Sequence, residues 1–596
     1  MAALAREWLR LDKDPETSLE IKKLLERQDI VELNKLLGSR LAFGTAGLRA
    51  RMGAGFARLN SLTIIQTSQG LAEYLLKEGN ASAGVVIGYD ARHNSKRFAE
   101  LAAAAFIAKR IPVWWYEDLV HTPMVPFGVG NLHAAAGIMI TASHNPAQDN
   151  GFKVYGSNGC QINTPVDEKI AASILNNLEP LTWDLTAQAD QRNSIQQSMR
   201  SRYVEKLKDY LGEPTPDLPR FVYTPLHGVG LPYLRAAISA SECMTVVEEQ
   251  AHPDPDFSTV QYPNPEEDGA LDLAKATADR TEIRLIVAND PDADRFATAE
   301  KINGRWYQFT GDQVGVLMAT FLLEKSKLKS KDLALTTTVS SQMLSVIAKG
   351  SFDVEETLTG FKWLGNRALE LGGQFAYEEA LGYMFPQVVL DKDGIAAAAI
   401  FLQACATWGS PWARLQQLYQ QFGYFETMNT YWKSPDLVTT AATFERIRML
   451  GAPYPTYVAR RKVLRWRDLT IGFDSETEDH KPVLPSSPNT QMITIWLEGN
   501  DFAKDSQEAD YGVRFTIRAS GTEPKIKSKR LPSTFFTQTD MAACPAVYSE
   551  CQAVSWRAAR DGAARVLQLI RNEWFNDPRL LIEDKFRDGF PWQLDH

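Results

Sequence analysis

Gly137-Ile138-Met139-Ile140 is a short apolar run that leads directly into the polar loop Thr141-Ala142-Ser143-His144-Asn145-Pro146. Such a run, bounded by turn residues, predicts a buried strand, and its loop places a hydroxyl beside an imidazole at the strand end. Ligands of open α/β sheets bind at this end of the strands. Ser143 can accept and donate a phosphoryl group there, although Ser, Asn and Pro are also ordinary turn residues.

Short apolar runs alternate with helical stretches on both sides of this loop. Before it, the runs Val85–Gly88 and Val113–Tyr116 flank a helical stretch over Lys96–Lys109, and a helical pair is expected between Pro15 and Leu37. This alternation is typical of α/β units. It returns farther along the chain, at Phe221–Thr224, Thr245–Val247, Arg284–Ala288 and Leu333–Val339. The sequence therefore predicts repeated α/β domains.

The pattern changes after about Tyr431. Val513, Phe515 and Ile517 alternate with polar residues, as in a half-exposed strand, and a closing helix is expected over Trp556–Asn572. A final α+β domain fits this pattern.

The composition is that of an ordinary globular protein with several domains. The 596 residues include 64 Lys plus Arg and 73 Asp plus Glu, a net charge of -9, which argues against a nucleic-acid partner. The five cysteines are odd in number and lack CxxC spacing, so we expect free thiols in a reducing compartment. The N-terminus lacks a secretory apolar core, and the apolar stretch Gly394–Phe401 is too short to span a membrane. We expect a soluble cytoplasmic protein without a membrane partner.

A second polar loop follows the apolar run Ile283–Ala288 and reads Asn289-Asp290-Pro291-Asp292-Ala293-Asp294-Arg295. Its three carboxylates stand at alternate positions and can converge on one hard cation. Mg2+ suits such a site because it takes few protein carboxylates and fills its other positions with water or phosphate oxygens. Arg295 would then balance charge near a bound phosphate. A solvated acidic turn is the alternative, whereas an EF-hand is excluded because Arg295 and Lys301 stand where Gly and Glu are required.

Two further polar segments can contribute to a site. Arg518-Ala519-Ser520-Gly521-Thr522-Glu523-Pro524-Lys525 offers two cations, two hydroxyls and the backbone N–H groups around Gly521, a combination that binds phosphate. In Thr359-Gly360-Phe361-Lys362, a lysine follows a glycine turn and could assist proton movement if partly desolvated. Close behind, the adjacent acids Glu378 and Glu379 can hydrogen-bond neighbouring sugar hydroxyls. Taken singly, each segment is also compatible with an ordinary surface turn.

Together, and in this order, the four loops resemble the α-D-phosphohexomutase superfamily, whose members carry a TASHNP-type phosphoserine loop, a DxDxD metal loop, a sugar-binding loop and a C-terminal SGTEP phosphate loop. The resemblance spans about Leu41 to Lys527. Three segments look most like the phosphoglucomutase-2 / phosphopentomutase branch: Gly44-Thr45-Ala46-Gly47-Leu48-Arg49, Thr359-Gly360-Phe361-Lys362 and Phe375-Ala376-Tyr377-Glu378-Glu379-Ala380-Leu381-Gly382. Many other branches have Ser where Ala380 stands.

The resemblance implies a role for each loop. Ser143 becomes the phosphoserine and a metal contact, and the Mg2+ ligands are Asp290, Asp292 and Asp294. His144, beside the nucleophile, would hydrogen-bond or transfer a proton. Arg49 and Lys153 match basic positions of the family's catalytic site, and Lys362 matches a lysine near the reacting oxygens. The sugar would be bound by Thr359, Gly360, Glu378 and Glu379. The site for the phosphate that does not react would consist of Arg518, Ser520, Gly521, Thr522 and Lys525.

The implied architecture is three related α/β domains and a C-terminal α+β domain around a central cleft, which agrees with the alternation described above. We place the domains at residues 1–205 with the phosphoserine loop, 206–312 with the metal loop, 313–435 with the sugar-binding loop and 436–596 with the phosphate loop.

The implied activity is an intramolecular phosphoryl transfer between a sugar 1-phosphate and its 5- or 6-phosphate, the sugar being ribose, deoxyribose or glucose. Phospho-Ser143 gives its group to one sugar hydroxyl, the resulting bisphosphate turns around, and its other phosphate returns to Ser143. Ribose 1,5-bisphosphate or glucose 1,6-bisphosphate would be both intermediate and activator. The sequence does not separate pentose from hexose substrates, nor does it give the oligomeric state.

One segment departs from the family pattern. The strand that begins at Ile526-Lys527 normally continues directly, whereas here about 20 residues, Ser528–Val547, precede Tyr548-Ser549-Glu550. A lineage-specific insertion or a retained intron would produce such a tract. It adjoins the phosphate loop at Lys525.

Two other functions stay open on the sequence alone. One is the synthesis of glucose 1,6-bisphosphate, in which a glycolytic acyl phosphate recharges the serine. The other is a non-catalytic, phosphorylation-regulated binding protein on a mutase scaffold. The intact Ser143, the three aspartates Asp290, Asp292 and Asp294, and Lys362 argue against it.

Overall fold

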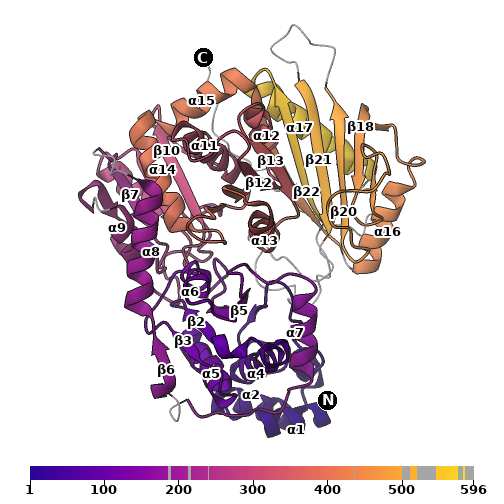
Figure 1. Cartoon of the computed structure of the whole chain (residues 1–596). Coiled ribbons are helices and arrows are strands. Elements are labelled where there is room, and N and C mark those ends of the chain that lie inside the picture. The colour runs from indigo at the N-terminus through magenta and orange to yellow at the C-terminus, as the bar shows by residue number, and fades with distance from the viewer. Residues whose placement is uncertain are drawn as a thin grey trace. The chain divides into compact units, whose positions relative to one another are not determined.

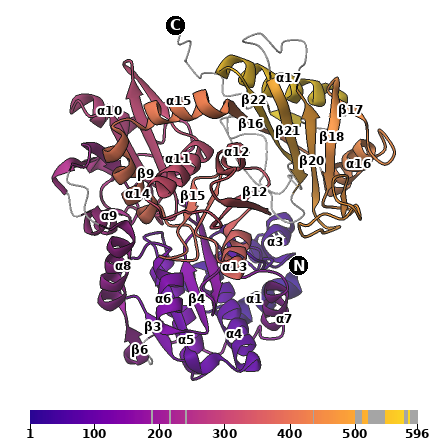
Figure 2. The same ribbon diagram turned by 45° about the horizontal axis from the view of Figure 1, so that its top comes forward.

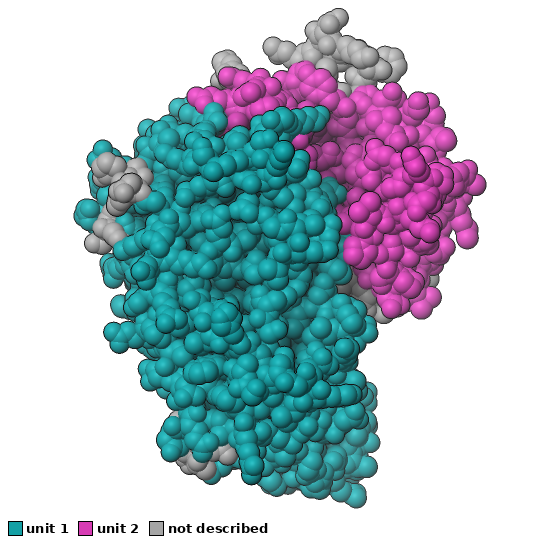
Figure 3. Space-filling view, viewed as in Figure 1, with its two compact units in different colours: residues 1–337, 348–414 teal, residues 338–347, 415–596 magenta. Residues whose placement is uncertain are grey.

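The computed structural model describes residues 1–185, 189–212, 217–238, 241–434, 436–499, 510–519, 545–574 and 581–583 (Figure 1). The chain divides into two compact units, which Figure 3 colours separately. Unit 1 consists of Met1–Thr337 and Ala348–Arg414, and unit 2 of Thr338–Ile347 and Leu415–His596. Each unit has its own sheets and hydrophobic core, so each is described by itself.

Unit 1 begins with three short helices, α1 (Ala2–Leu11), α2 (Pro15–Glu26) and α3 (Ile30–Leu37). The side chains of Asp14 and Asp29 cap α2 and α3 by accepting backbone N–H groups of the first turn. Trp8, Ile21 and Leu33 are fully buried in the small core between the helices. The helical pair expected between Pro15 and Leu37 is confirmed, and α1 is an addition to it.

The first α/β domain contains a six-stranded sheet in the order β1-β5-β4-β2-β3-β6. Val85 and Ile87 of β2 face the core formed with α4 and α5, whereas Val86 lies against Gly128 of α6 on the opposite face. Strand β4 contacts α6 and α5, and Figure 2 shows these three elements together. The elements are β1 (Leu48–Arg51), α4 (Ser61–Glu78), β2 (Val85–Tyr89), α5 (Ser95–Ala108), β3 (Val113–Trp115), α6 (Met124–Leu132), β4 (Ala136–Ile140), β5 (Asp149–Gly156), α7 (Val166–Leu175) and β6 (Arg192–Ser194).

Strand β4 positions the loop that contains Ser143. It runs parallel to β2, with Ile138 opposite Ile87, and antiparallel to β5, with Met139 opposite Lys153. The loop therefore leaves the carboxyl end of an interior strand, as predicted, and Lys153 lies on the adjacent strand. The strands and the helix expected from Val85 to Thr141 are confirmed within two residues of their predicted bounds.

The second α/β domain contains a five-stranded sheet in the order β11-β10-β9-β7-β8. Strands β7 and β9 are parallel, and β10 returns antiparallel to β9, so residues 290–295 form the connection at the carboxyl end of the buried β9. The predicted strands of this region are confirmed. The elements are α8 (Gln196–Leu211), β7 (Phe221–Thr224), α9 (Leu231–Ile238), β8 (Met244–Val246), α10 (Asp272–Arg280), β9 (Leu285–Asn289), β10 (Phe296–Ile302) and β11 (Arg305–Gln308).

The third α/β domain contains a four-stranded sheet in the order β13-β12-β14-β15. Strand β14 ends at Glu378, and α13 begins directly after Gly360, so both predicted sugar-loop segments lie at element ends. The elements are α11 (Gly311–Glu324), β12 (Leu333–Thr337), α12 (Met343–Ala348), β13 (Asp353–Thr357), α13 (Phe361–Leu371), β14 (Phe375–Glu378), β15 (Gly382–Met384), α14 (Gly394–Trp408) and α15 (Pro411–Phe422).

Unit 2 contains an eight-stranded antiparallel sheet in the order β17-β18-β20-β21-β22-β16-β23, with β19 paired to β18. Helix α17 packs on β22, β16 and β21, which matches the predicted closing helix. The elements are β16 (Tyr424–Lys433), α16 (Leu437–Arg448), β17 (Tyr457–Val458), β18 (Arg461–Asp468), β19 (Phe473–Asp474), β20 (Gln491–Glu498), β21 (Asp510–Ala519), β22 (Pro545–Ala553), α17 (Trp556–Trp574) and β23 (Leu581–Glu583).

Two segment boundaries predicted from the sequence do not coincide with the strand bounds in unit 2. Strand β16 pairs with β22 along most of its length, so residues 424–433 belong to the C-terminal sheet rather than to a third domain that ends at residue 435. Of the tract Ser528–Val547, residues 528–544 lie outside the described residues, whereas Pro545–Val547 form the first part of β22. Both differences arise because a strand pairs with partners that are distant in sequence, and local sequence patterns do not reveal these partners.

The prediction of three α/β domains and a C-terminal α+β domain is confirmed by the four sheets. The central cleft stays a prediction. Across the described ranges, no helix combines the length and apolar character that crossing a bilayer requires. Among the cysteines, Cys160, Cys243, Cys405 and Cys551 are free thiols, and Cys544 lies outside the described residues.

Candidate active site

Ser143 adopts a left-handed backbone conformation in the turn after β4. Its φ is 54°, which costs a residue with a side chain about 1 kcal/mol, so other contacts must hold it. Its own N–H donates to the Thr141 hydroxyl at 2.8 Å, and its carbonyl accepts from the guanidinium of Arg92. The residue is only 2% exposed. The hydroxyl is therefore fixed in a site that excludes most water.

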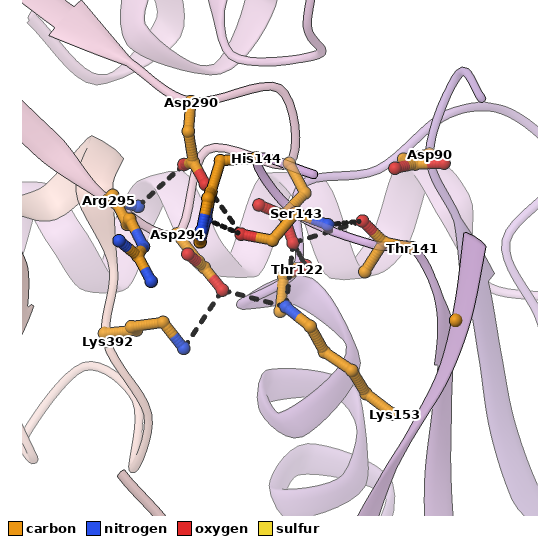
Figure 4. A network of polar contacts seen from close by, with 12 residues as sticks. Asp90, Thr122, Thr141, Ser143, His144, Lys153, Asp290, Asp294, Arg295 and Lys392 are labelled. Atoms are coloured by element: carbon orange, nitrogen blue, oxygen red, sulfur yellow. Dashed lines mark hydrogen bonds and ion pairs between the residues drawn. The ribbon is translucent and has the colours of Figure 1, made fainter. Parts of the chain in front are cut away.

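The hydroxyl of Ser143 points at the acidic loop that follows β9 (Figure 4). Its Oγ donates to Oδ2 of Asp290 at 2.8 Å, and Nδ1 of His144 lies 3.2 Å from the same Oγ. The two loops are 147 residues apart in sequence. The structure thus brings together the two segments that the sequence singled out first.

The three carboxylates of the acidic loop form one cluster. Asp290, Asp292 and Asp294 are fully buried, and each offers an oxygen that lies within 4.8 Å of the others. Within the described part of the chain, no other group of three or more His, Cys, Asp or Glu side chains meets this condition. Oδ1 of Asp292 and Oδ1 of Asp294 are buried without a hydrogen-bond partner. Buried carboxylate oxygens without partners are the donors that a hard divalent cation takes, so the residues present fit a Mg2+ site.

Two lysines occupy the other side of this cluster. The ammonium of Lys153 donates to Oδ2 of Asp292 at 2.8 Å and to Oδ2 of Asp294 at 2.9 Å. The ammonium of Lys392 lies 3.1 Å from Oδ2 of Asp294 (Figure 4). Both lysine side chains are about nine-tenths buried, so these ion pairs are poorly screened. The lysines bind the Oδ2 atoms and leave both Oδ1 atoms free.

Burial sets the charge state of the cluster. It raises the pKa of Asp290 well above its usual range, and the neighbouring carboxylates of Asp292 and Asp294 add to the rise. Burial acts in the same direction on Asp292, but the ammonium of Lys153 outweighs it and holds the pKa of Asp292 well below its usual range. For Lys392, burial opposes the charged form, yet Asp294 and other carboxylates raise its pKa. The cluster therefore favours added positive charge next to Asp290.

Arg295 connects the acidic loop to its surroundings. Its backbone N–H donates to Oδ1 of Asp290 at 3.0 Å, and Nη1 lies 3.7 Å from the carboxylate of Glu266. Burial alone would lower the pKa of Arg295, but Asp290 and Glu266 raise it above its usual value. The guanidinium stays charged beside the cluster.

The paired acids of the third domain lie at the end of β14. Burial raises the pKa of Glu378 to about 7, and the neighbouring carboxylate of Glu379 contributes to the rise. Oε2 of Glu379 accepts a hydrogen bond from the Thr337 hydroxyl at 3.2 Å. Glu378 can thus be either protonated or charged near neutrality, which suits a group that meets ligand hydroxyls.

Lys362 lies at the start of α13 in the third domain, and Arg49 lies on β1 of the first domain. Gly360 has a φ of 104°, which only glycine adopts readily, and it turns the chain into α13. The ammonium of Lys362 then donates to the Thr45 hydroxyl at 2.5 Å. Arg49 is exposed on β1, where it pairs with Gly151 of β5, two residues before Lys153.

The predicted phosphate loop is described only at its beginning. Arg518 lies near the end of β21, opposite Met492 of β20 and Ala546 of β22. Ser520, Gly521, Thr522 and Lys525 lie outside the described residues.

Comparison with known proteins identifies the family. Three family models match in series: phosphoglucomutase/phosphomannomutase α/β/α domain I at residues 40–180, domain II at 201–303 and domain III at 310–422. The chain belongs to the phosphoglucomutase/phosphomannomutase family. The resemblance to the α-D-phosphohexomutase superfamily is therefore confirmed.

Individual relatives indicate which branch of the phosphoglucomutase/phosphomannomutase family this chain resembles. The probable phosphoribomutase of Schizosaccharomyces pombe is 42% identical, over 98% of this chain and 99% of its own length. The human phosphopentomutase is 43% identical over 87% and 89%, and the human glucose 1,6-bisphosphate synthase 39% identical over 87% and 88%. The open form of the Paramecium phosphoglucomutase parafusin has a TM-score of 0.64 at 19% identity, covering 90% of this chain and 95% of that one, which supports the shared fold.

Several residues of this family member contact the site but were not predicted from the sequence. Lys392 comes from the run Asp391-Lys392-Asp393-Gly394, whose charges directly before an apolar helix are a signal that could have been used. Arg92 and Thr122 gave no such signal, because a single arginine or threonine in a loop is common. Their contacts with Ser143 and Asp292 exist only after the chain has folded.

Proposed function

We propose that this chain is a phosphosugar mutase that interconverts ribose or deoxyribose 1-phosphate with the 5-phosphate and glucose 1-phosphate with glucose 6-phosphate. The observation that carries the proposal is the buried Ser143 hydroxyl, 2.8 Å from an aspartate of the Asp290, Asp292 and Asp294 cluster. The names of relatives above 40% identity, phosphoribomutase and phosphopentomutase, support the pentose reaction in particular.

Ser143 is the phosphoryl carrier in this proposal. A hydroxyl of the sugar monophosphate attacks the phosphorus of phospho-Ser143, the Ser143 Oγ–P bond breaks, and a sugar bisphosphate forms. The bisphosphate turns around, the freed Ser143 Oγ attacks its other phosphate, and the isomeric monophosphate leaves. Atoms balance over the cycle, and the enzyme ends phosphorylated. Burial of the serine supports this role because water would otherwise hydrolyse the phosphoserine.

The buried carboxylates of Asp290, Asp292 and Asp294 would hold Mg2+ together with the Ser143 side chain. When bound, the cation would act as a Lewis acid on the oxygen that bridges Ser143 and phosphorus. Lys153 and Lys392 bind the Oδ2 atoms of Asp292 and Asp294, which supports the proposal that their unpartnered Oδ1 atoms would be ligands of the cation.

The other residues have roles that match the family motifs. Lys362 would move the proton of the reacting sugar hydroxyl, and His144 would hydrogen-bond the reacting oxygens. Arg49 and Arg295 would balance the charge of the transferred phosphoryl group. Glu378 and Glu379, with the turn at Thr359 and Gly360, would bind the sugar hydroxyls. The loop Arg518, Ser520, Gly521, Thr522 and Lys525 would bind the phosphate that is not being transferred.

The domain limits 1–205, 206–312 and 313–435 remain part of the proposal, with one change. The third family model ends at residue 422 and β16 belongs to the C-terminal sheet, so we propose that the third domain ends near residue 422. We further propose a cytoplasmic location and a phosphosugar ligand without a nucleic-acid or membrane partner.

Mutase turnover of Ser143→Ala tests the central claim. The purified wild type should convert ribose 1-phosphate to ribose 5-phosphate in the presence of Mg2+ and a catalytic amount of sugar bisphosphate, and the variant should not. Full turnover by the variant would overturn the phosphoserine mechanism. The ratio of kcat/KM for ribose 1-phosphate to that for glucose 1-phosphate then decides between pentose and hexose preference.

A second candidate function is supported by the relatives named glucose 1,6-bisphosphate synthase at 39% identity. In that reaction an acyl phosphate donates its phosphoryl group to Ser143, which passes it to glucose 1-phosphate. The rate of bisphosphate formation from 1,3-bisphosphoglycerate, measured beside mutase turnover on the same preparation, separates the two. Synthesis faster than mutase turnover would favour this second function.

A further inference from the structure

Thr122 holds Asp292 at two points, although it lies 170 residues away in sequence. The backbone N–H of Thr122 donates to the carbonyl of Asp292 at 2.9 Å, and its hydroxyl donates to Oδ2 of Asp292 at 2.7 Å. Both residues are fully buried. One residue thus holds both the main chain and the carboxylate of the central aspartate in the cluster.

The two oxygens of Asp292 have opposite surroundings. Oδ2 accepts from Thr122, from the Lys153 ammonium at 2.8 Å and from the Thr141 hydroxyl at 3.3 Å. Oδ1 is buried and has no hydrogen-bond partner. The two oxygens of a carboxylate are chemically equivalent, so these donors do not select one of them. By binding one oxygen they fix the orientation of the carboxylate group, and the other oxygen is left without a donor.

Thr122 has a short side chain on a backbone that several contacts hold in place. It belongs to the turn that starts α6, where Met124 N–H donates to the carbonyl of His121 at 3.0 Å and Val125 N–H to that of Thr122 at 3.1 Å. The buried imidazole of His121 packs against the rings of Tyr203 and Tyr233, with centroids 4.9 and 4.1 Å away. Lys153, by contrast, reaches the cluster through a long side chain and divides its contacts between Asp292 and Asp294.

We propose that Thr122 is a positioning residue of the metal site: its hydroxyl holds Oδ2 of Asp292 so that Oδ1 faces the cation. This inference rests on the metal site of the proposed function. Thr122 does not touch the metal itself in this arrangement. Groups that orient metal ligands from behind typically change metal affinity by about 10- to 100-fold when removed.

Four variants test the inference by metal binding, without any turnover. Thr122→Val keeps the branched shape and the backbone N–H but lacks the hydroxyl, whereas Thr122→Ser keeps the hydroxyl. Thr298→Val is the matched control, because Thr298 is equally buried, lies in the domain that contains Asp292, and its hydroxyl donates to the carbonyl of Ile286 at 2.8 Å. Asp292→Asn reports whether binding occurs at the cluster. The probe is Mn2+, titrated into metal-free full-length protein while free Mn2+ is followed by electron paramagnetic resonance.

We expect Thr122→Val to bind Mn2+ about 10- to 100-fold more weakly than the wild type. Thr122→Ser and Thr298→Val should bind close to the wild-type affinity. Equal affinity of Thr122→Val and the wild type would overturn the inference, as would an equal loss in Thr298→Val or no recovery in Thr122→Ser. Equal binding by the wild type and Asp292→Asn would instead overturn the proposed metal site, and this inference with it.

Discussion

The guanidinium of Arg92 donates to the backbone carbonyl of Ser143, the residue whose left-handed conformation presents the hydroxyl to Asp290. The same guanidinium also donates to the carbonyls of Asn145 at 2.6 Å, Pro146 at 2.9 Å and Asp149 at 3.2 Å. Its charge is balanced by Asp90, whose Oδ2 lies 3.3 Å from Nε, and its face lies over the ring of Phe257. One buried side chain thus holds the whole turn around the candidate nucleophile.

Replacing Arg92 by Lys is expected to lower kcat for mutase turnover by about 10-fold or more, with little change in KM for the sugar phosphate. Lysine keeps the positive charge, but its single ammonium group cannot donate to all four carbonyls that the planar guanidinium binds. The turn that contains Ser143 therefore loses its fixed geometry. Steady-state kinetics and the rate of Ser143 phosphorylation by a sugar bisphosphate, followed by mass spectrometry, check this. Arg97→Lys is the control, since Arg97 pairs at the surface with Asp14. Wild-type kcat in Arg92→Lys would contradict the prediction.

Replacing Lys153 by Met leaves Asp292 and Asp294 buried with one cation fewer. Breaking a buried ion pair in this way typically costs about 3 to 5 kcal/mol. In metal-free buffer we therefore expect the first unfolding transition of the variant to have its midpoint at a lower urea concentration than that of the wild type. Added Mg2+ should stabilise the variant more than the wild type. Lys301→Met is the control, because Lys301 pairs with Asp279 in a partly exposed position, where such pairs contribute about 0 to 1 kcal/mol. Equal losses in the two variants would argue against the buried pair.

Asp393 should make the stability of the wild type depend on pH. Burial raises its pKa to about 6, even though the carboxylate caps α14 through the N–H groups of Ile395 and Ala396 and accepts from the Tyr203 hydroxyl. In the unfolded chain an aspartate titrates near pH 4. As the pH falls, Asp393 is therefore protonated in the folded protein before it is protonated in the unfolded chain. The free-energy cost of burying its charge is present in full above pH 6 and decreases as the pH falls towards 4.

The amide of Asp393→Asn keeps the cap and carries no charge. Between pH 7.5 and pH 5 we expect the wild type to gain about 1 to 1.5 kcal/mol relative to this variant. Urea midpoints of both proteins at the two pH values measure the difference. A difference that stays constant with pH would show that Asp393 does not titrate in this range.

Gly394 lies where a side chain has no room. A Cβ at this position would lie 2.2 Å from the carbonyl oxygen of Arg295 and 2.6 Å from Nδ2 of Asn289, so the end of the acidic loop would have to move. We expect Gly394→Ala to destabilise the protein by about 1 to 3 kcal/mol, the usual cost of overpacking. In Gly130→Ala, by contrast, the new Cβ meets nothing within 4 Å in helix α6, and a gain of up to about 1 kcal/mol is expected. Thermal melts of both variants check this, and similar melting temperatures would contradict it.

The sequence was sufficient for those parts of the fold that depend on local patterns. The strands before Ser143 and Asp290 could be predicted because each is a short run of apolar residues, of the length typical of a buried strand, that ends in a polar turn. The end of the third domain stays a prediction. Strand β16, which lies just before residue 435, pairs with β22 more than 100 residues farther along the chain, and local patterns do not reveal such a pairing. Arg92 and Thr122 were missed for a related reason: each has an unremarkable sequence context and acquires its role from a distant loop. Lys392 stands in a charged run that could have drawn attention, but its partner Asp294 is likewise distant in sequence.

The sequence by itself determined which chemical groups this protein carries at its strand ends: a serine, three aspartates and the basic and acidic residues of the family motifs. It did so because each loop directly follows a strand that local hydrophobicity identifies. Only the tertiary structure decided how these groups face one another, namely that Ser143 donates to Asp290 and that Thr122 and Lys153 occupy one oxygen of Asp292 and leave the other free. The physical reason is that a hydrogen bond depends on positions within a few tenths of an ångström, and packing of segments over 100 residues apart sets those positions.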